Sequence, residues 1–212
     1  MIITAQKPLQ TIIATVGKGP VFLIGCSECA TLCHTGGEEE VQAMKETLKK
    51  HHVLVTGCVI LDPACHLQND KRLLRQHADA VKKAQKILVL ACGNGTQTVA
   101  EIITDADVIC GTDTLFLGEI QRANQFEERC QLCGECILDQ FAGFCPVARC
   151  PKSMLNGPCG GSIDGQCEVH PDLDCVWYLI YKKLKEQGKT AQLRCICQPK
   201  DWSKSTEMKR SI

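Results

Sequence analysis

The first half of the chain alternates short apolar runs with segments whose apolar residues recur at helical spacing. The runs are rich in β-branched residues, which is typical of parallel strands that are covered on both faces. They lie at residues 21–24, 53–55, 87–91 and 108–109. Residues 20–118 are therefore predicted to contain four strands.

Amphipathic segments separate these runs and predict helices. In the first, Val41, Met44 and Leu48 share one face and follow three glutamates, which favour a helix N-terminus. Residues 35–38 fit a capping box before it. Two further helices are expected at about 70–84 and 96–103. This order predicts an α/β fold, an N-terminal open and mostly parallel sheet with flanking helices.

The second half lacks such periodicity until its end. Residues 126–169 are rich in cysteine, glycine and proline, and an amphipathic helix is expected at about 171–187. The sequence thus predicts two domains. Residues 1–122 would form the α/β domain with an N-terminal cysteine loop, and residues 123–212 an irregular cysteine-rich metal-cluster domain that ends in a helix.

Composition narrows the function. The 212 residues include 24 basic and 24 acidic side chains and only 4% aromatics. A neutral chain poor in aromatics does not favour nucleic acid or an anionic membrane as a partner. We see no secretory signal or membrane-length apolar run and expect a cytoplasmic protein. In a reducing cytosol, the 17 cysteines are better explained as metal ligands than as disulfides.

Several cysteines are expected at the carboxyl ends of the predicted strands, where open α/β sheets place their sites. Cys26, Cys29 and Cys33 follow the first strand and can supply three ligands of one metal centre. Cys92, after the third strand, is the preferred fourth ligand, because its strand should neighbour the first. Cys65 and then Cys58 are the alternatives. Cys58 is placed after the second strand and Cys110 at the end of the fourth.

Eight more cysteines make up two complete four-ligand sets. The first three have the CxxCxxC spacing of bacterial ferredoxins, which favours iron–sulfur clusters, whereas zinc ribbons prefer two separated CxxC pairs. Zinc stays the alternative at one or more sites. The expected ligands are Cys130, Cys133, Cys136, Cys145, Cys150, Cys159, Cys167 and Cys175.

Longer motifs resemble a known family. The segment GCSECATLCHTGG at residues 25–37, with residues 88–93 and 113–119, resembles the small subunit of acetogen-type methylenetetrahydrofolate reductase. Residues 130–177 resemble the cysteine-rich methylenetetrahydrofolate reductase C-terminal domain, through motifs such as LNGPCGG and DCVW. The resemblance implies 4Fe-4S clusters, two in the C-terminal domain and one more at the N-terminal loop. It also implies a catalytic partner subunit that alone carries flavin.

Three hypotheses follow. In the first, the chain relays electrons from an upstream donor protein through its clusters to the flavin of the partner, which makes methyltetrahydrofolate. In the second, zinc stabilises a scaffold that docks the catalytic subunit to its electron donor without a redox role. In the third, a thiol-redox enzyme uses Cys195 and Cys197 or the N-terminal loop. The sequence does not decide the roles of five cysteines, Cys58, Cys65, Cys110, Cys195 and Cys197.

Overall fold

The computed structural model describes residues 1–205 and divides into two compact units. Unit 1 comprises residues 1–116 with 122–124, and unit 2 comprises residues 117–121 and the chain from 125 onward. The division runs within one long strand, β6 (Thr112–Arg122), so the sequence boundary at residue 122 stays a prediction. Within residues 1–205, no helix is both long and apolar enough to cross a bilayer.

Unit 1 is built on a four-stranded sheet in which every neighbouring pair of strands is parallel. The strand order is β3-β2-β4-β5, which confirms the predicted α/β fold. All six residues of β2 are buried, so this strand is covered on both faces. The strands are β2 (Val21–Cys26), β3 (Val55–Leu61), β4 (Lys86–Leu90) and β5 (Asp107–Cys110).

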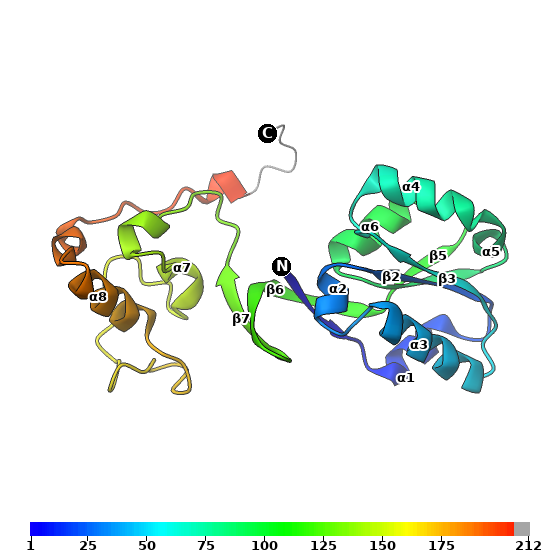
Figure 1. Cartoon of the computed structure of the whole chain (residues 1–212), viewed down its shortest axis with the longest axis horizontal. Helices are drawn as coiled ribbons and strands as arrows, with labels where there is room; N and C mark the ends of the chain where they lie inside the picture. Colours follow the sequence, from blue (N-terminus) through cyan, green and yellow to red (C-terminus); the bar gives the residue numbers. More distant parts are fainter. Residues whose placement is uncertain (206–212) are drawn as a thin grey trace. The chain divides into compact units, whose positions relative to one another are not determined.

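Helices cover both faces of this sheet, and β2 divides its side chains between the two resulting cores (Figure 1). Phe22 and Ile24 point into one core, whereas Val21 and Leu23 point into the other. This alternation follows from the two-residue repeat of a strand. One face carries α1 (Leu9–Val16) and α3 (Glu38–Lys50), and the other carries α4 (Leu67–Gln76), α5 (Ala78–Lys82) and α6 (Gly93–Ile102).

The second strand lies later in the chain than predicted. Residue 53 lies in the segment after α3 and is tied back to that helix, since its N–H donates to the Leu48 carbonyl at 3.0 Å. The strand then continues to Leu61 and carries Cys58 in its middle, opposite Leu23. The placement of Cys58 after this strand was therefore wrong, and Cys65 is the cysteine that follows it.

Two helix predictions also need correction. The helix expected at 70–84 is broken at His77, which ends α4 and begins α5 and packs its ring against Phe22. The N-cap of α3 is Gly37, not Thr35, and the Gly37 N–H donates to the Glu40 carboxylate at 2.9 Å. The Thr35 hydroxyl instead pairs with that of Thr4 at 2.7 Å.

A second sheet was not predicted from the sequence. It has three strands in the order β1-β6-β7, with β1 at Ile2–Gln6 and β7 at Gln125–Cys130. Most residues of β6 are exposed, so the strand lacks the apolar alternation that marks a half-buried strand.

Unit 2 has little regular structure and a small core around its longest helix, α8 (Val176–Glu186). The buried side chains are Phe141, Val176, Trp177, Ile180 and Leu184. The helix begins five residues later than predicted, because residues 171–173 form a turn and Asp174 forms an isolated β-bridge with Gln166. The other elements are η1 (Leu138–Phe141), α7 (Pro146–Arg149), η2 (Thr190–Arg194) and η3 (Trp202–Ser205).

One buried carboxylate in unit 1 lacks a partner. Asp70, in the first turn of α4, is 0% exposed, and neither of its carboxylate oxygens has a hydrogen-bond partner within residues 1–205. Desolvation raises the pKa of Asp70 from 3.8 to about 6, and the backbone and imidazole of His66 offset part of this rise. The folded state therefore binds this proton more tightly than the unfolded state does.

This burial predicts how Asp70→Asn changes stability with pH. The contribution of Asp70 to the free energy of unfolding is fully present below the pKa that this group has in the unfolded chain. It is lost as pH rises through about 6, the pKa in the folded state. The free energy of unfolding of the uncharged variant should be about 1–3 kcal/mol higher than that of the wild type at pH 8, and this difference should shrink toward pH 5. Urea unfolding of the full chain at several pH values measures this. Asp79→Asn, at an exposed position on α5, is the control. Equal pH profiles for the two variants would contradict the prediction.

Candidate metal centres

Four of the predicted ligands in unit 2 surround one small hollow. Cys150, Cys159, Cys167 and Cys175 all line a cavity of about 20 Å³ beneath Trp177 and Val176. They come from separate parts of a 26-residue stretch, so the chain has to fold back on itself to bring them together. All seventeen cysteines of the protein are free thiols in the structure.

Local backbone structure fixes three of these cysteines. Cys150 ends α7, and Cys175 is the residue that precedes the first turn of α8. The Cys167 N–H donates to the Leu173 carbonyl and the Cys175 N–H to the Gly165 carbonyl, both at 2.8 Å. These two bonds hold the segments around Cys167 and Cys175 side by side.

The fourth cysteine lies on a glycine-rich loop. Gly157 and Gly160 flank the Cys159 region with φ of +122° and +85°, a conformation that favours glycine. The Cys159 thiol donates to the Glu168 carboxylate at 3.4 Å. Lys152 pairs with the same carboxylate at 2.7 Å and, together with the Cys159 bond, lowers the pKa of Glu168. Lys152 thus places a positive charge beside the hollow.

The donor set suits a thiophilic metal, because four thiolates are the ligands of both structural zinc and iron–sulfur clusters. A hollow of about 20 Å³ has room for about one water molecule. A cluster would therefore need the glycine loop to open, whereas a single ion would need less movement. Within residues 1–205, no three His, Cys, Asp or Glu side chains are gathered at the spacing of a single-ion site. The thiols must therefore turn inward to bind either metal.

The other four predicted ligands of unit 2 lie along the chain between β7 and α7. Cys130 ends β7, and its sulfur accepts the Leu132 N–H at 3.3 Å. Leu132 and Gly134 both have left-handed backbones, so the CxxCxxC loop winds tightly. Cys136 is exposed, and Cys145 precedes α7. The sequence did not assign these four cysteines to one site, and within residues 1–205 their separate positions do not bring them to one hollow as in the first group.

An ion-pair network connects the two groups of cysteines within unit 2. Glu127 pairs with Arg129 at 2.8 Å and with Arg149 at 3.3 Å, and Arg129 also pairs with Glu119 at 2.7 Å. Arg129 is followed by Cys130, and Arg149 by Cys150. Burial is the main cause that lowers the pKa of Arg149. The network therefore fixes the start of one cysteine group relative to the start of the other.

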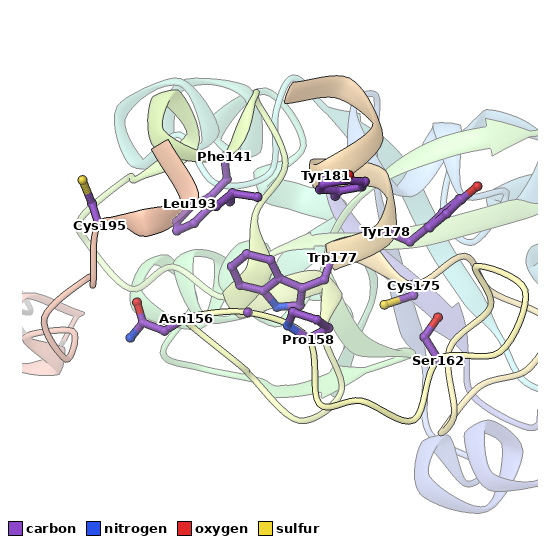
Figure 2. Close-up of a pocket in the computed structure, with 11 residues that line it drawn as sticks. Phe141, Asn156, Pro158, Ser162, Cys175, Trp177, Tyr178, Tyr181, Leu193 and Cys195 are labelled. Atoms are coloured by element: carbon purple, nitrogen blue, oxygen red, sulfur yellow. The ribbon is translucent and has the colours of Figure 1, made fainter. Parts of the chain in front are cut away.

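An aromatic cavity of about 450 Å³ adjoins the hollow (Figure 2). Ser162, Cys175 and Trp177 line both spaces. Trp177 packs edge-on against Phe141 at a ring distance of 5.4 Å and donates its indole N–H to the Met154 carbonyl at 2.9 Å. Figure 2 shows Cys175 on the Ser162 side of the cavity and Cys195 at the opposite end.

The predicted ligands of unit 1 lie on the loop after β2. Cys26 is the last residue of β2, Cys29 begins α2 (Cys29–Leu32), and Cys33 ends it. The backbone of Ile2 contacts two of them. Its N–H donates to the Cys29 sulfur at 3.4 Å, and its carbonyl accepts from the Cys33 thiol at 3.7 Å.

Cys92 and Cys65 lie at the ends of the neighbouring strands. Cys92 is the N-cap of α6 and follows β4, which pairs with β2 as predicted. Cys65 lies on the loop after β3 and is exposed. The protein around its thiol still desolvates it enough to raise the pKa of Cys65. Cys92, Cys26 and Cys29 raise that pKa further. Cys92 was preferred to Cys65 as the fourth ligand because its strand was expected to neighbour β2, and β3 pairs with β2 as well.

The remaining cysteines have partners of other kinds. The Cys58 sulfur accepts from the Gln42 amide at 3.7 Å, and the Cys110 thiol donates to the Thr112 carbonyl at 2.9 Å. Cys197 is held by Asn156, which accepts its N–H at 2.7 Å and donates to its carbonyl at 3.0 Å. Cys195 is exposed. None of these contacts resembles a metal site.

Fold and thiols together define a protein with an α/β unit and a cysteine-rich unit, each carrying a candidate metal centre. Comparison with protein families then adds a relationship. Residues 109–203, less than half of the chain, match the family described as methylene-tetrahydrofolate reductase C terminal. This part of the chain is therefore a domain of that type and relates the protein to methylenetetrahydrofolate reductase complexes. No curated protein and no solved structure matches the chain.

Packing at Gly36 predicts a test of how the cysteine loop of unit 1 is positioned. A Cβ at Gly36 would lie 1.7 Å from the Leu90 carbonyl oxygen, and the Gly36 carbonyl accepts the Cys26 N–H at 2.9 Å. Gly36→Ala should therefore push the loop away from the end of β4 and destabilise unit 1 by about 3 kcal/mol or more. Hydrogen exchange of the β2 and β4 amides in the full chain measures this loss.

Gly93→Ala is the matched control for this experiment. A Cβ there would meet only the Thr114 hydroxyl at 3.3 Å, so the variant should change protection by less than about 1 kcal/mol. Similar losses of hydrogen-exchange protection in both variants would show that the close approach of Gly36 to Leu90 does not hold the loop in place.

Proposed function

We propose that the protein is the electron-transfer subunit of a methylenetetrahydrofolate reductase complex. It passes electrons through 4Fe-4S clusters to the flavin of a catalytic partner subunit, which makes methyltetrahydrofolate. The family match of residues 109–203 supports the complex, and the cysteine sets support the clusters. The free thiols suit a reducing cytoplasm.

The convergence of Cys150, Cys159, Cys167 and Cys175 on one hollow carries this proposal. All four belong to the segment that matches the family. A bound cluster supplies one-electron storage, whereas reduction of the folate requires two electrons, so the flavin of the partner must collect them. The chain itself supplies the thiolates, and Trp177, which packs edge-on against Phe141, lines the hollow beside Cys175.

Charge around the hollow also suits a negatively charged centre. The Lys152 ammonium is held beside Cys159 by the shared Glu168 carboxylate. Backbone and side-chain charges around a thiolate-bound cluster set how readily it accepts an electron. The thiols of the CxxCxxC loop and of unit 1 would hold the further clusters, and an upstream donor protein would reduce them. The chain alone needs no flavin or folate site for this role.

The donor set of the hollow also suits a second candidate. A single zinc ion needs less space than a cubane, so the same four thiolates can hold zinc. In that case, unit 2 would be a scaffold that docks the catalytic subunit to its electron donor without carrying electrons.

Metal analysis of the anaerobically purified protein separates the two candidates. Electron transfer predicts a brown protein with broad visible absorption that bleaches on reduction and with about four irons and four sulfides per cluster. A colourless protein that contains zinc and no sulfide would favour the scaffold and exclude the relay.

Removing one thiol from the hollow tests its role directly. Cys159→Ala should lower the iron content by about four per chain, because one of the four ligands is missing. Since Cys159 is exposed, its loss leaves no cavity in a core. Cys195→Ala, at another exposed cysteine of unit 2, is the control and should keep the full metal content. Equal iron in both variants would remove Cys159 from the ligand set.

A further inference from the structure

The loops that follow β2 and β3 are joined directly at the edge of the unit 1 sheet. Cys26 pairs in register with Leu61, the last residue of β3. The next residue, Ser27, donates its N–H to the Leu61 carbonyl at 3.0 Å and its hydroxyl to the Asp62 carboxylate at 2.5 Å. The segment that carries Cys65 is therefore attached to the segment between Cys26 and Cys29.

The same loop after β3 packs against the start of α6. A Cβ at Gly95 would lie 3.1 Å from the Ala64 Cβ and 3.2 Å from the Ala64 carbonyl oxygen. Ala64, which is 1% exposed, directly precedes Cys65, and Cys92 caps the helix that contains Gly95. Cys65 is thus placed between the strand end that carries Cys26 and the helix start that carries Cys92.

Cys33 makes a different contact from Cys29. The Cys33 thiol donates to the Ile2 carbonyl of β1 at 3.7 Å, whereas the Cys29 sulfur accepts the Ile2 N–H at 3.4 Å. A sulfur that accepts an N–H is compatible with a thiolate ligand, while the proton of the Cys33 thiol is directed to a backbone carbonyl.

We infer that Cys26, Cys29, Cys65 and Cys92 form a four-thiolate metal site at the carboxyl ends of β2, β3 and β4, and that Cys33 is a structural thiol. This changes the ligand set expected from the sequence by replacing Cys33 with Cys65. The inference deepens the proposed function, on which it rests for the identity of the metal, an iron–sulfur cluster. The four thiolates can equally hold zinc, and the experiment distinguishes the two.

Two backbone features stabilise negative charge at this site. Cys92 caps the N-terminus of α6, a helix of ten residues, whose dipole favours an anionic group there. The Ile2 N–H donates to the Cys29 sulfur at 3.4 Å, the kind of contact that supports a thiolate ligand. Because Cys65 is exposed, the site reaches the surface of unit 1.

Protection from alkylation tests the role of Cys65 in the unmodified protein. A free thiol as exposed as Cys65 should react rapidly with iodoacetamide, whereas a metal ligand should not. In the anaerobically prepared, metal-loaded full chain, mass spectrometry should find Cys65 alkylated at least about tenfold more slowly than in the same chain after metal removal with a chelator. Cys195 is the control and should react at the same rate in both preparations. Rapid alkylation of Cys65 in the loaded protein overturns the inference.

Matched variants test the exchange of Cys65 for Cys33. Cys65→Ala should lose about four irons, or one zinc, per chain, whereas Cys33→Ala should retain the full metal content. Hydrogen exchange of β2 verifies that the sheet of each variant is folded. Full metal content in Cys65→Ala, or metal loss confined to a folded Cys33→Ala, overturns the inference.

The two proposals fail in different ways. If the loaded protein is brown but its Cys65 is rapidly alkylated, the electron-transfer proposal is supported and this metal site is excluded. A colourless, zinc-loaded protein whose Cys65 is protected keeps the site and excludes electron transfer.

Discussion

The parallel pairing of β2 with both β3 and β4 is the constraint on which the chemistry of unit 1 depends. Parallel strands end at the same edge of a sheet, so three loops must leave the sheet close together. Each of them carries at least one cysteine near its start. Because β2 is buried on both faces, its direction cannot change without unpacking two cores. The hydrophobic effect therefore brings the three cysteine-bearing loops to one edge of the sheet before any metal is involved.

In unit 2, the cysteine-bearing segments are positioned with much less buried apolar surface than in unit 1. Its core consists of five buried side chains, four of them on α8, and most of its backbone follows turns and left-handed residues. A segment with so small a core gains stability from whatever ties its loops together. If Cys150, Cys159, Cys167 and Cys175 bind a metal, the binding free energy also contributes to folding. Metal binding and the order of this unit would then be coupled.

The sequence predicted the sheet of unit 1 because its buried strands consist of short apolar runs. It also placed the strand of Cys92 beside that of Cys26, which is correct. It misplaced β3, because six of its seven residues are only partly buried and Gly57 interrupts the run. That error placed Cys58 after the strand, where the structure has Cys65. The β6–β7 strands and the partition of the cysteines depend on long-range hydrogen bonds and packing, which one-dimensional periodicity does not record.

These differences assign different physical roles to the two candidate centres. In unit 1, the candidate ligands stand at the end of a sheet that two apolar cores hold in place. In unit 2, they stand on loops around a hollow of about 20 Å³ beside one small core. Within residues 1–205, no three metal-binding side chains of either unit are gathered at the spacing of a single-ion site, so side chains have to move in both. The backbone around the unit 1 cysteines is better supported by apolar packing, so less of the free energy of metal binding is needed to order it than in unit 2.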